Sequence, residues 1–288
     1  MKLFDLHCDT ATELYRRNLP FENPETHLNA AALAGHEVTQ CFAVFLNDTQ
    51  ESSGAMDFFE AVARRIETDL RRPGLTPILT LEGAGVLATH PDWIDRIAAR
   101  ECRMAGIVWN GKNPLATGAV TDDKEGLSDL GKEAVKELLR RGIILDVSHL
   151  SAAGTDDILI LTDAPVAASH SNARSIRNHP RNLTDEQAVE IFRRGGIVGL
   201  NLYPPFLGEG ETGIGDILRH AEHFLTLGGE NGLALGCDFD GVDRLPRGIR
   251  HFGDLPLLTK ALERAFGPEI CRNICYHNAE RFFFGNGR

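Results

Sequence analysis

The chain has 288 residues, of which 42% are hydrophobic, and it carries a formal net charge of −11 at pH 7 with a pI near 5.5. This length suffices for one barrel of about 250 residues with short additions, or for two smaller domains. The acidic balance repels polyanions and supplies no basic stripe for a phosphate backbone, which argues against nucleic acid as a partner.

The beginning of the chain and its cysteines bear on its compartment. The first apolar run starts directly after Met1 and leads into His7, which leaves no room for a signal peptide ahead of it. No later stretch approaches the ~18 uninterrupted apolar residues of a membrane span. The six cysteines are scattered through apolar runs, and the cluster of Cys271, Cys275 and His277 lies in a helix-like segment where packing is the favoured role. We therefore expect a cytoplasmic protein with reduced thiols and no membrane contact.

Short apolar runs bounded by glycine, proline or asparagine recur along the chain and predict buried strands. Their number, eight, is the number that a closed α/β barrel requires. The runs cover residues 3–7, 38–46, 77–82, 104–109, 142–148, 165–169, 196–202 and 233–238.

Amphipathic helical patterns separate these runs. Apolar residues at helical spacing occur within 58–70 and 130–139, with charged residues between them. Gly142, Gly195 and Gly228 stand where a helix would end and feed the next strand. The alternation of strand and helix predicts an α/β fold, namely a (β/α)8 TIM-type barrel.

The alternative is an open, doubly wound sheet, which would usually carry a glycine-rich phosphate turn after its first strand. The sequence after the first predicted strand is His7-Cys8-Asp9-Thr10 instead. A glycine-rich stretch at 207–215 follows the seventh strand, where barrels often bind phosphate, but its acidic residues favour a flexible active-site loop. No linker interrupts the chain, so we expect one catalytic domain spanning 1–288.

Residues of metal-ligand type gather at the ends of the predicted strands, on the face where barrel enzymes place their active sites. His7 and Asp9 are two residues apart, so on an extended backbone both can hold one cation. Glu82 ends the third strand, where a carboxylate is costly to bury without a cationic partner. His149 and His170 end the fifth and sixth strands. Each alone would suit a hydrogen-bonded core position, but together they predict a metal centre.

A further carboxylate closes the eighth strand. Asp238 lies at the same rim, where it can pass protons beside a metal-bound water, whereas Asp240 suits a turn with Gly241. The whole set suits two metal ions ~3.5–4 Å apart that share one activated water. Zinc is favoured over magnesium because three imidazoles are present.

Other histidines have weaker claims to this centre. His220 and His223 are three apart on a helical pattern, for which an outer barrel helix is the favoured place. His179, two residues before Arg181, is a candidate for lining the site.

Several motifs in a fixed order give the chain a resemblance, nearly end to end, to the membrane (renal) dipeptidase family, a group of binuclear zinc peptidases with an amidohydrolase-like barrel. The motifs are Asp5-Leu6-His7-Cys8-Asp9-Thr10, Leu81-Glu82-Gly83, Gly126-Leu127-Ser128 through Lys136-Glu137-Leu138 into Asp146-Val147-Ser148-His149, Ser169-His170-Ser171, and Gly236-Cys237-Asp238-Phe239-Asp240-Gly241.

The resemblance implies two zinc ions per chain. The residues that match the family's ligands are His7 and Asp9 for one ion, His149 and His170 for the other, and Glu82 as the bridge between them.

The resemblance also implies roles for residues beyond the ligands. Asp238 corresponds to the proton-transferring acid, and Arg181 to the residue that holds the substrate's terminal carboxylate, a task suited to a planar guanidinium. One departure concerns a substrate-contacting histidine of the animal enzymes after the fourth strand. Trp109 aligns with it here, or Asn110 if the register slips by one, so the substrate range of this chain is open.

The expected activity is that of a metallo-dipeptidase, which hydrolyses a small dipeptide to free amino acids by a hydroxide bridging the metals. The family also suggests a homodimer. One rival is a metal-dependent amidohydrolase acting on another small amide or lactam, since fold does not fix function. Another is a non-catalytic, metal-stabilised barrel that serves as a binding partner, against which the intact Asp238 argues.

Overall fold

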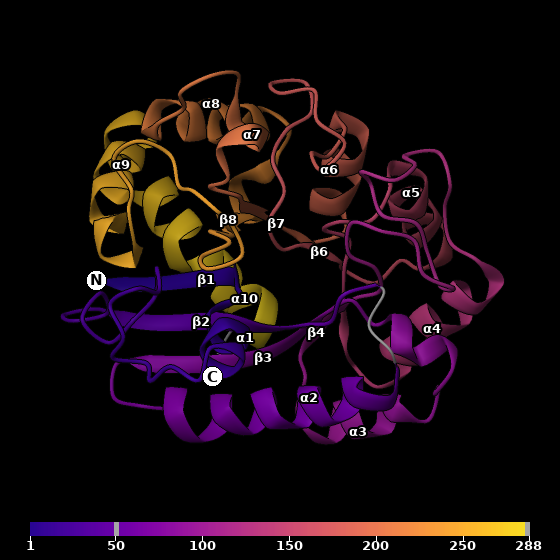
Figure 1. Cartoon of the computed structure of the whole chain (residues 1–288). Coiled ribbons are helices and arrows are strands. Elements are labelled where there is room, and N and C mark those ends of the chain that lie inside the picture. Colours follow the sequence, from indigo (N-terminus) through magenta and orange to yellow (C-terminus); the bar gives the residue numbers. More distant parts are fainter. Residues whose placement is uncertain (49–51, 286–288) are drawn as a thin grey trace.

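Parallel strands pair in chain order, from β1 to β8, and close into a barrel with the helices outside it (Figure 1). The computed structural model of the protein describes residues 1–48 and 52–285. The first and last strands close the barrel, because β1 (Lys2–Cys8) pairs with β2 (Glu37–Phe45) on one side and with β8 (Leu233–Leu235) on the other, where Asp5 is the partner of Leu235. The predicted barrel is therefore confirmed.

Each of the eight predicted runs overlaps one strand of the barrel, and the first three strands begin one or two residues before the predicted run. The later strands are shorter than predicted, because their apolar runs continue as buried loops past the last paired residue. The strands are β1 Lys2–Cys8, β2 Glu37–Phe45, β3 Leu75–Glu82, β4 Met104–Gly106, β5 Ile144–Asp146, β6 Ala167–Ala168, β7 Ile197–Leu200 and β8 Leu233–Leu235.

Helices follow the strands and cover the outside of the barrel (Figure 1). The α-helices are α1 Thr10–Arg16, α2 Ser52–Arg65, α3 Trp93–Ala99, α4 Asp129–Arg140, α5 Ala152–Leu161, α6 Asp185–Arg193, α7 Pro204–Leu207, α8 Ile214–Thr226, α9 Leu255–Arg272 and α10 Asn278–Phe284. The shorter or wider helical turns are η1 Ile66–Leu70, η2 Gly85–Ala88, η3 Gly229–Asn231, η4 Phe252–Asp254 and η5 Asn273–His277.

Capping side chains fix where several of these helices begin. Ser128 accepts a hydrogen bond from the backbone N–H of Gly131 at the start of α4, and Ser151 accepts one from that of Gly154 at the start of α5. Thr184 forms a capping box with Gln187 at the start of α6. These caps define where each loop above the barrel ends, and so hold the loops that carry the site.

Glycines follow three of the helices, α4, α6 and α8, where the sequence predicted. Gly142, Gly195 and Gly228 have φ between 70° and 92°, in the left-handed region that glycine adopts without strain.

The lower half of the barrel is filled by side chains and closed by the last helix. Phe4 and Leu6 of β1 join residues of the other strands in one buried cluster that also includes Phe283 of α10. The ring of Phe283 stacks on that of Phe4 with centroids 5.3 Å apart. The open end of the barrel is therefore the one at the carboxyl ends of the strands. No helix of the described residues is long and apolar enough to cross a membrane.

Candidate metal and catalytic centre

Five side chains of metal-ligand type meet at the open end of the barrel. His7 lies in β1 and Asp9 directly after it, Glu82 is the last residue of β3, and His149 and His170 follow β5 and β6. None of the five is more than 8% exposed. The structure thus brings together every residue that the sequence singled out as a metal ligand. In one detail it differs: β1 ends at Cys8, and Asp9 reaches the cluster from the N-cap position of α1.

Glu82 lies between two pairs of potential metal ligands. Its Oε1 is 2.9 Å from His149 Nε2, and its Oε2 is 3.4 Å from His7 Nε2. Beyond these, His170 Nε2 is 2.8 Å from His149 Nε2, and Asp9 Oδ2 is 3.5 Å from His7 Nε2. The two oxygens of the Glu82 carboxylate therefore face different pairs of ligand-type residues, as they would in a carboxylate that bridges two cations.

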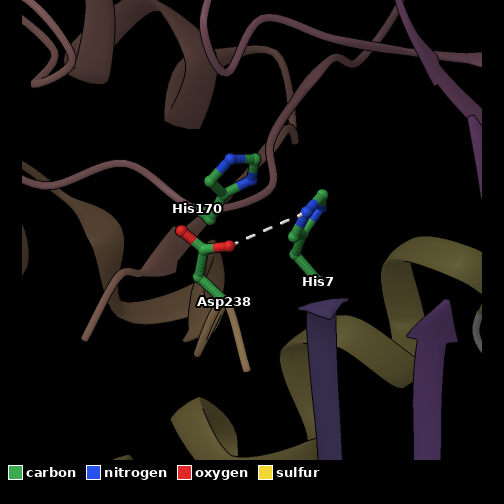
Figure 2. Close-up of side chains that lie close together, drawn as sticks. All are labelled: His7, His170 and Asp238. Atoms are coloured by element: carbon green, nitrogen blue, oxygen red, sulfur yellow. Dashed lines mark ion pairs between the residues drawn. The ribbon is translucent and has the colours of Figure 1, made fainter. Parts of the chain in front are cut away.

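The side chains form three overlapping groups, and within each group the ligand atoms lie within 4.8 Å of one another. Two of them have only Glu82 in common: one adds His7 and Asp9, and the other adds His149 and His170. The third combines His7 and His170 with Asp238, whose carboxylate points toward His7 (Figure 2). A division into two metal positions with Glu82 shared between them is therefore compatible with the geometry.

Two buried atoms of this cluster, His7 Nε2 and Asp9 Oδ1, have no hydrogen-bond partner among the described residues. Leaving a buried polar atom unpaired costs about 1–3 kcal/mol. A cation would satisfy both atoms, and the mixture of imidazole nitrogen and carboxylate oxygen is one that zinc and similar divalent ions accept. The residues present fit a metal centre.

The electrostatic environment keeps two of the histidines available as ligands. Burial, and after it the positive charge of Arg181, lowers the pKa of His149 to about 4. Burial and the neighbouring charge of His7 hold the pKa of His170 well below its usual value. Because a metal binds only neutral imidazole, both rings are in the correct state at neutral pH.

His7 and Asp9, which face the other oxygen of Glu82, have pKa values that are shifted upward. Burial alone would lower the pKa of His7, but the carboxylates of Glu82 and Asp9 outweigh it and raise that pKa well above its usual value. Burial and the nearby Glu82 raise the pKa of Asp9 to about 7. Protons are thus held where a cation would replace them.

Two residues of the site have a backbone conformation that is rare outside glycine. His149 has φ of 70° and Asp238 has φ of 62°, both in the left-handed region. Such residues persist only where the surrounding structure holds them, and they concentrate at functional sites.

The turn after Asp238 is tied down by Asp240 and needs a glycine at 241. Asp240 accepts hydrogen bonds from Thr10 Oγ1 and from the backbone N–H of His27, so it has the structural role that its sequence context suggested. A Cβ on Gly241 would lie 2.3 Å from oxygens of both Asp238 and Asp9. Any side chain there would displace the two carboxylates.

Asp238 is buried and oriented by a residue that sequence reasoning missed. Asn201, directly after β7, donates from its Nδ2 to Asp238 Oδ2 over 3.0 Å, while Asp238 Oδ1 lies 4.0 Å from His7 Nε2. Burial and the charge of Glu82 raise the pKa of Asp238 against the opposing effect of His7. The signal for Asn201 is the same as for the ligands: a polar residue at the end of an apolar strand.

Arg181 is 4% exposed, yet no carboxylate of the described residues lies within 4.0 Å of its guanidinium. Its Nη2 makes one long contact of 3.4 Å with the backbone oxygen of His170, and its guanidinium carbon lies 5.3 Å from the centre of the Phe206 ring. Its Nε has no partner within the part of the chain that the structure describes. Burial lowers its pKa to about 10, so it remains charged. A buried, under-bonded guanidinium is suited to an external anion.

A pocket of about 370 Å³ opens above the cluster, a size suited to a small ligand. Trp109 and Asn110, where the sequence departs from the family that it resembles, both line this pocket. The Trp109 ring lies 5.0 Å from that of Phe45, and Asn110 Oδ1 lies 2.8 Å from His149 Nδ1. From the segment after β7, the lining residues are Tyr203 and Phe206, on or beside α7. The glycine-rich stretch at 207–215, expected to be an active-site loop, is not part of the lining.

His179 supports Arg181 from behind. Its Nδ1 accepts a hydrogen bond from the backbone N–H of Arg181 over 3.1 Å, and its ring packs against Phe206 with centroids 4.6 Å apart. It does not line the pocket.

The cysteine and histidine cluster near the C-terminus lies away from this site. Cys271 and Cys275 are buried with their sulfur atoms 3.9 Å apart, beside Met1 and Lys2 at the opposite end of the barrel. This agrees with a packing role.

His220 and His223 lie on α8, as expected for an outer helix, and point to different partners. His223 Nε2 is 2.9 Å from Asp185 Oδ1. His220 is fully buried: its Nδ1 accepts from the backbone N–H of Ala173, and its Nε2 donates to the backbone oxygen of Leu207. Only a neutral ring can make both of these bonds.

We therefore expect His220 to make the fold sensitive to acid. Burial lowers its pKa to about 4, below the unfolded value near 6.5, so its contribution is complete above pH 6.5 and is lost as the pH falls toward 4. The loss amounts to at most about 3 kcal/mol. Urea unfolding at pH 7.5 and 4.5 should show a smaller pH effect in His220→Gln than in the wild type. His90→Gln is the control, and an equal pH effect in His220→Gln and the wild type would contradict the assignment.

Comparison with known proteins gives consistent matches. A family model described as membrane dipeptidase, peptidase family M19, matches residues 55–284. An uncharacterised dipeptidase of Schizosaccharomyces pombe is 30% identical over 224 residues, which are 75% of this chain and 54% of the relative. A second from the same organism is 35% identical over 170 residues, 56% of this chain and 41% of the relative. The chain spans about half the length of these relatives or less.

Solved structures match over the whole fold. A metallopeptidase from Rhodobacter sphaeroides, determined with a phosphinate mimic of the dipeptide L-Ala-D-Ala, has a TM-score of 0.84 and 27% identity, with 97% of each chain covered. A dipeptidase of family M19 has a TM-score of 0.86 and 27% identity, with 99% of each chain covered.

Proposed function

Because the chain belongs to the membrane dipeptidase family, peptidase family M19, we propose that it hydrolyses dipeptides to free amino acids in a metal-dependent reaction. The observation that carries the proposal is the position of Glu82, with one oxygen toward His149 and the other toward His7, at the floor of a small pocket. A mimic of a dipeptide bound to the Rhodobacter sphaeroides metallopeptidase supports the substrate class.

We propose two zinc ions per chain. Bound there, they would lower the pKa of a water molecule and polarise the scissile carbonyl. The residues proposed to hold them are His7 and Asp9 for one, His149 and His170 for the other, and Glu82 for both.

The other residues of the site would bind the substrate and move its protons. Arg181 would hold the terminal carboxylate with paired N–H groups, which also satisfies its buried charge. Asp238 would take the proton that the attacking water loses and deliver it to the leaving amine, a role that its raised pKa favours. Trp109 and Asn110 would form the wall beside the substrate. The pocket of about 370 Å³ would then limit the length of the peptide.

A panel of substrates tests this function. Zinc-loaded protein should release amino acids from dipeptides, and should act far more slowly on tripeptides and on dipeptides with an amidated C-terminus. Faster turnover of amidated dipeptides or lactams would favour the rival, an amidohydrolase for other small amides. Bound zinc without turnover of any amide would indicate a non-catalytic barrel.

Asn201 offers a test of how Asp238 is oriented. We expect Asn201→Ala to lower kcat by ~10–100-fold, since a misplaced proton-transfer group loses much of the ~10²–10⁴-fold that such groups supply. The zinc content should stay unchanged, because among the described residues the Asn201 side chain meets the proposed ligand residues only at the backbone oxygen of His170, which is not a ligand atom. Wild-type kcat in Asn201→Ala would show that this hydrogen bond does not matter to turnover.

A further inference from the structure

His149 and His170 each make a second contact on the side of the ring that faces away from their paired Nε2 atoms. His149 Nδ1 lies 2.8 Å from Asn110 Oδ1, and His170 Nδ1 lies 2.7 Å from Ser169 Oγ. All of these atoms except those of Asn110 belong to residues that are at most 7% exposed. Each contact therefore acts on the ring from the side opposite the proposed metal.

These contacts determine which nitrogen of each ring carries the hydrogen. An amide oxygen only accepts hydrogen bonds, so His149 must donate to Asn110 from its Nδ1. Ser169 donates its single hydrogen to Asp146 Oδ2, so its oxygen accepts from His170 Nδ1. A neutral imidazole has one N–H group, which leaves the Nε2 atom of each ring with a bare lone pair.

The consequence is a set of acceptors without a hydrogen between them. His149 Nε2 lies 2.8 Å from His170 Nε2 and 2.9 Å from Glu82 Oε1. Three electron-rich atoms at these distances repel one another unless a cation lies among them.

The loop that carries Asn110 is itself held in place. The carboxylate of Asp48 accepts from the backbone N–H of Trp109 over 3.0 Å and from that of Gly111 over 2.7 Å, one residue on each side of Asn110. Thr121 Oγ1 donates to the Asn110 backbone oxygen over 2.7 Å. The amide is thus presented to His149 from a fixed backbone.

We infer that Asn110 is a positioning residue for metal binding: its Oδ1 fixes the tautomer and the orientation of His149, so that Nε2 faces the ion. This assigns to Asn110 a task separate from lining the pocket, and it rests on the proposed function. The two rings are supported unequally, because the chain of contacts behind His170 ends in the carboxylate of Asp146, whereas the one behind His149 ends in a neutral amide.

The test measures zinc affinity as well as turnover. Competition with a chelator of known affinity gives the two zinc dissociation constants of the full chain, and Co²⁺ absorption spectra report the geometry of each position. Asn110→Ala should weaken one ion by ~10–100-fold, the usual effect of losing the partner of a metal-bound histidine, and leave the other within a few-fold. Asn110→Asp supplies an acceptor in the same place and should restore the affinity. Asn231→Ala, which alters an asparagine at the opposite end of the barrel, should behave as the wild type.

Two results would overturn the inference: wild-type zinc constants in Asn110→Ala, or a loss in Asn110→Asp as large as in Asn110→Ala. The melting temperatures of the metal-free variants separate a local effect from misfolding, and a selective effect on one ion excludes general damage. If the wild type hydrolyses no dipeptide, the proposed function fails, but the zinc constants still decide the role of Asn110. If dipeptides are hydrolysed and the constants do not change, only the role of Asn110 fails.

Discussion

Glu82→Gln is expected to lose most of the bound metal and to lower kcat/KM for dipeptides by about 10³-fold or more, which corresponds to roughly 4 kcal/mol of transition-state stabilisation. The amide has nearly the shape of the carboxylate, but it offers a single acceptor oxygen and no negative charge to face His7 and His149 together. Both proposed metal positions would be weakened at once.

Elemental analysis after dialysis and steady-state kinetics measure these two effects on one preparation. The fold should persist, because the substitution keeps the volume of a side chain that is 7% exposed. Glu37→Gln, which alters an exposed acid at the first residue of β2 and so at the opposite end of the barrel, is the control and should retain both metal and activity. Undiminished turnover in Glu82→Gln would disprove the central role of this carboxylate.

Arg181→Met is expected to impair substrate recognition without lowering the stability of the protein. Loss of a paired, charge-assisted contact with a carboxylate should lower kcat/KM for dipeptides by roughly 10²–10³-fold. The rate on C-terminally amidated dipeptides should barely change, because they have no carboxylate to lose. Lysine at this position keeps the charge but not the planar pair of donors, so Arg181→Lys should be intermediate.

The stability of Arg181→Met should not fall with its activity. The guanidinium is buried without a carboxylate partner among the described residues, and replacing such a charge by an apolar chain of similar length is often neutral or stabilising. We expect the melting temperature of the metal-free protein to stay level or rise. An equal loss of rate on free and amidated dipeptides, or a large drop in melting temperature, would assign Arg181 a structural role instead.

The barrel was predictable from the sequence because its strands are buried on both faces and stand out as short apolar runs. The same signal misjudged where the later strands end. Ile107 and Val108 are as buried as the strand before them, yet β4 stops at Gly106, and composition cannot separate a paired strand from a buried loop.

The convergence of the ligand-type residues followed from one rule, that parallel strands end at one face. What the rule could not supply is orientation. The contacts of Asn110 with His149 and of Asn201 with Asp238 join separate loops, and the left-handed backbone of His149 and Asp238 depends on the packing around it. The sequence accordingly indicates which residues meet, but not which ones hold them in place.

Closure of the barrel between β1 and β8 has a consequence for biosynthesis. Within this sequence His7 is synthesised before every other residue of the site, whereas β8, which lies beside β1 and leads into Asp238, follows more than two hundred residues later, and Phe283 at the floor of the barrel comes later still. Contacts between such distant segments form slowly and late. The proposed ligands, from His7 to His170, are therefore all synthesised before the strand that closes the barrel beside them, and we expect the folded metal site to form only once β8 has been made.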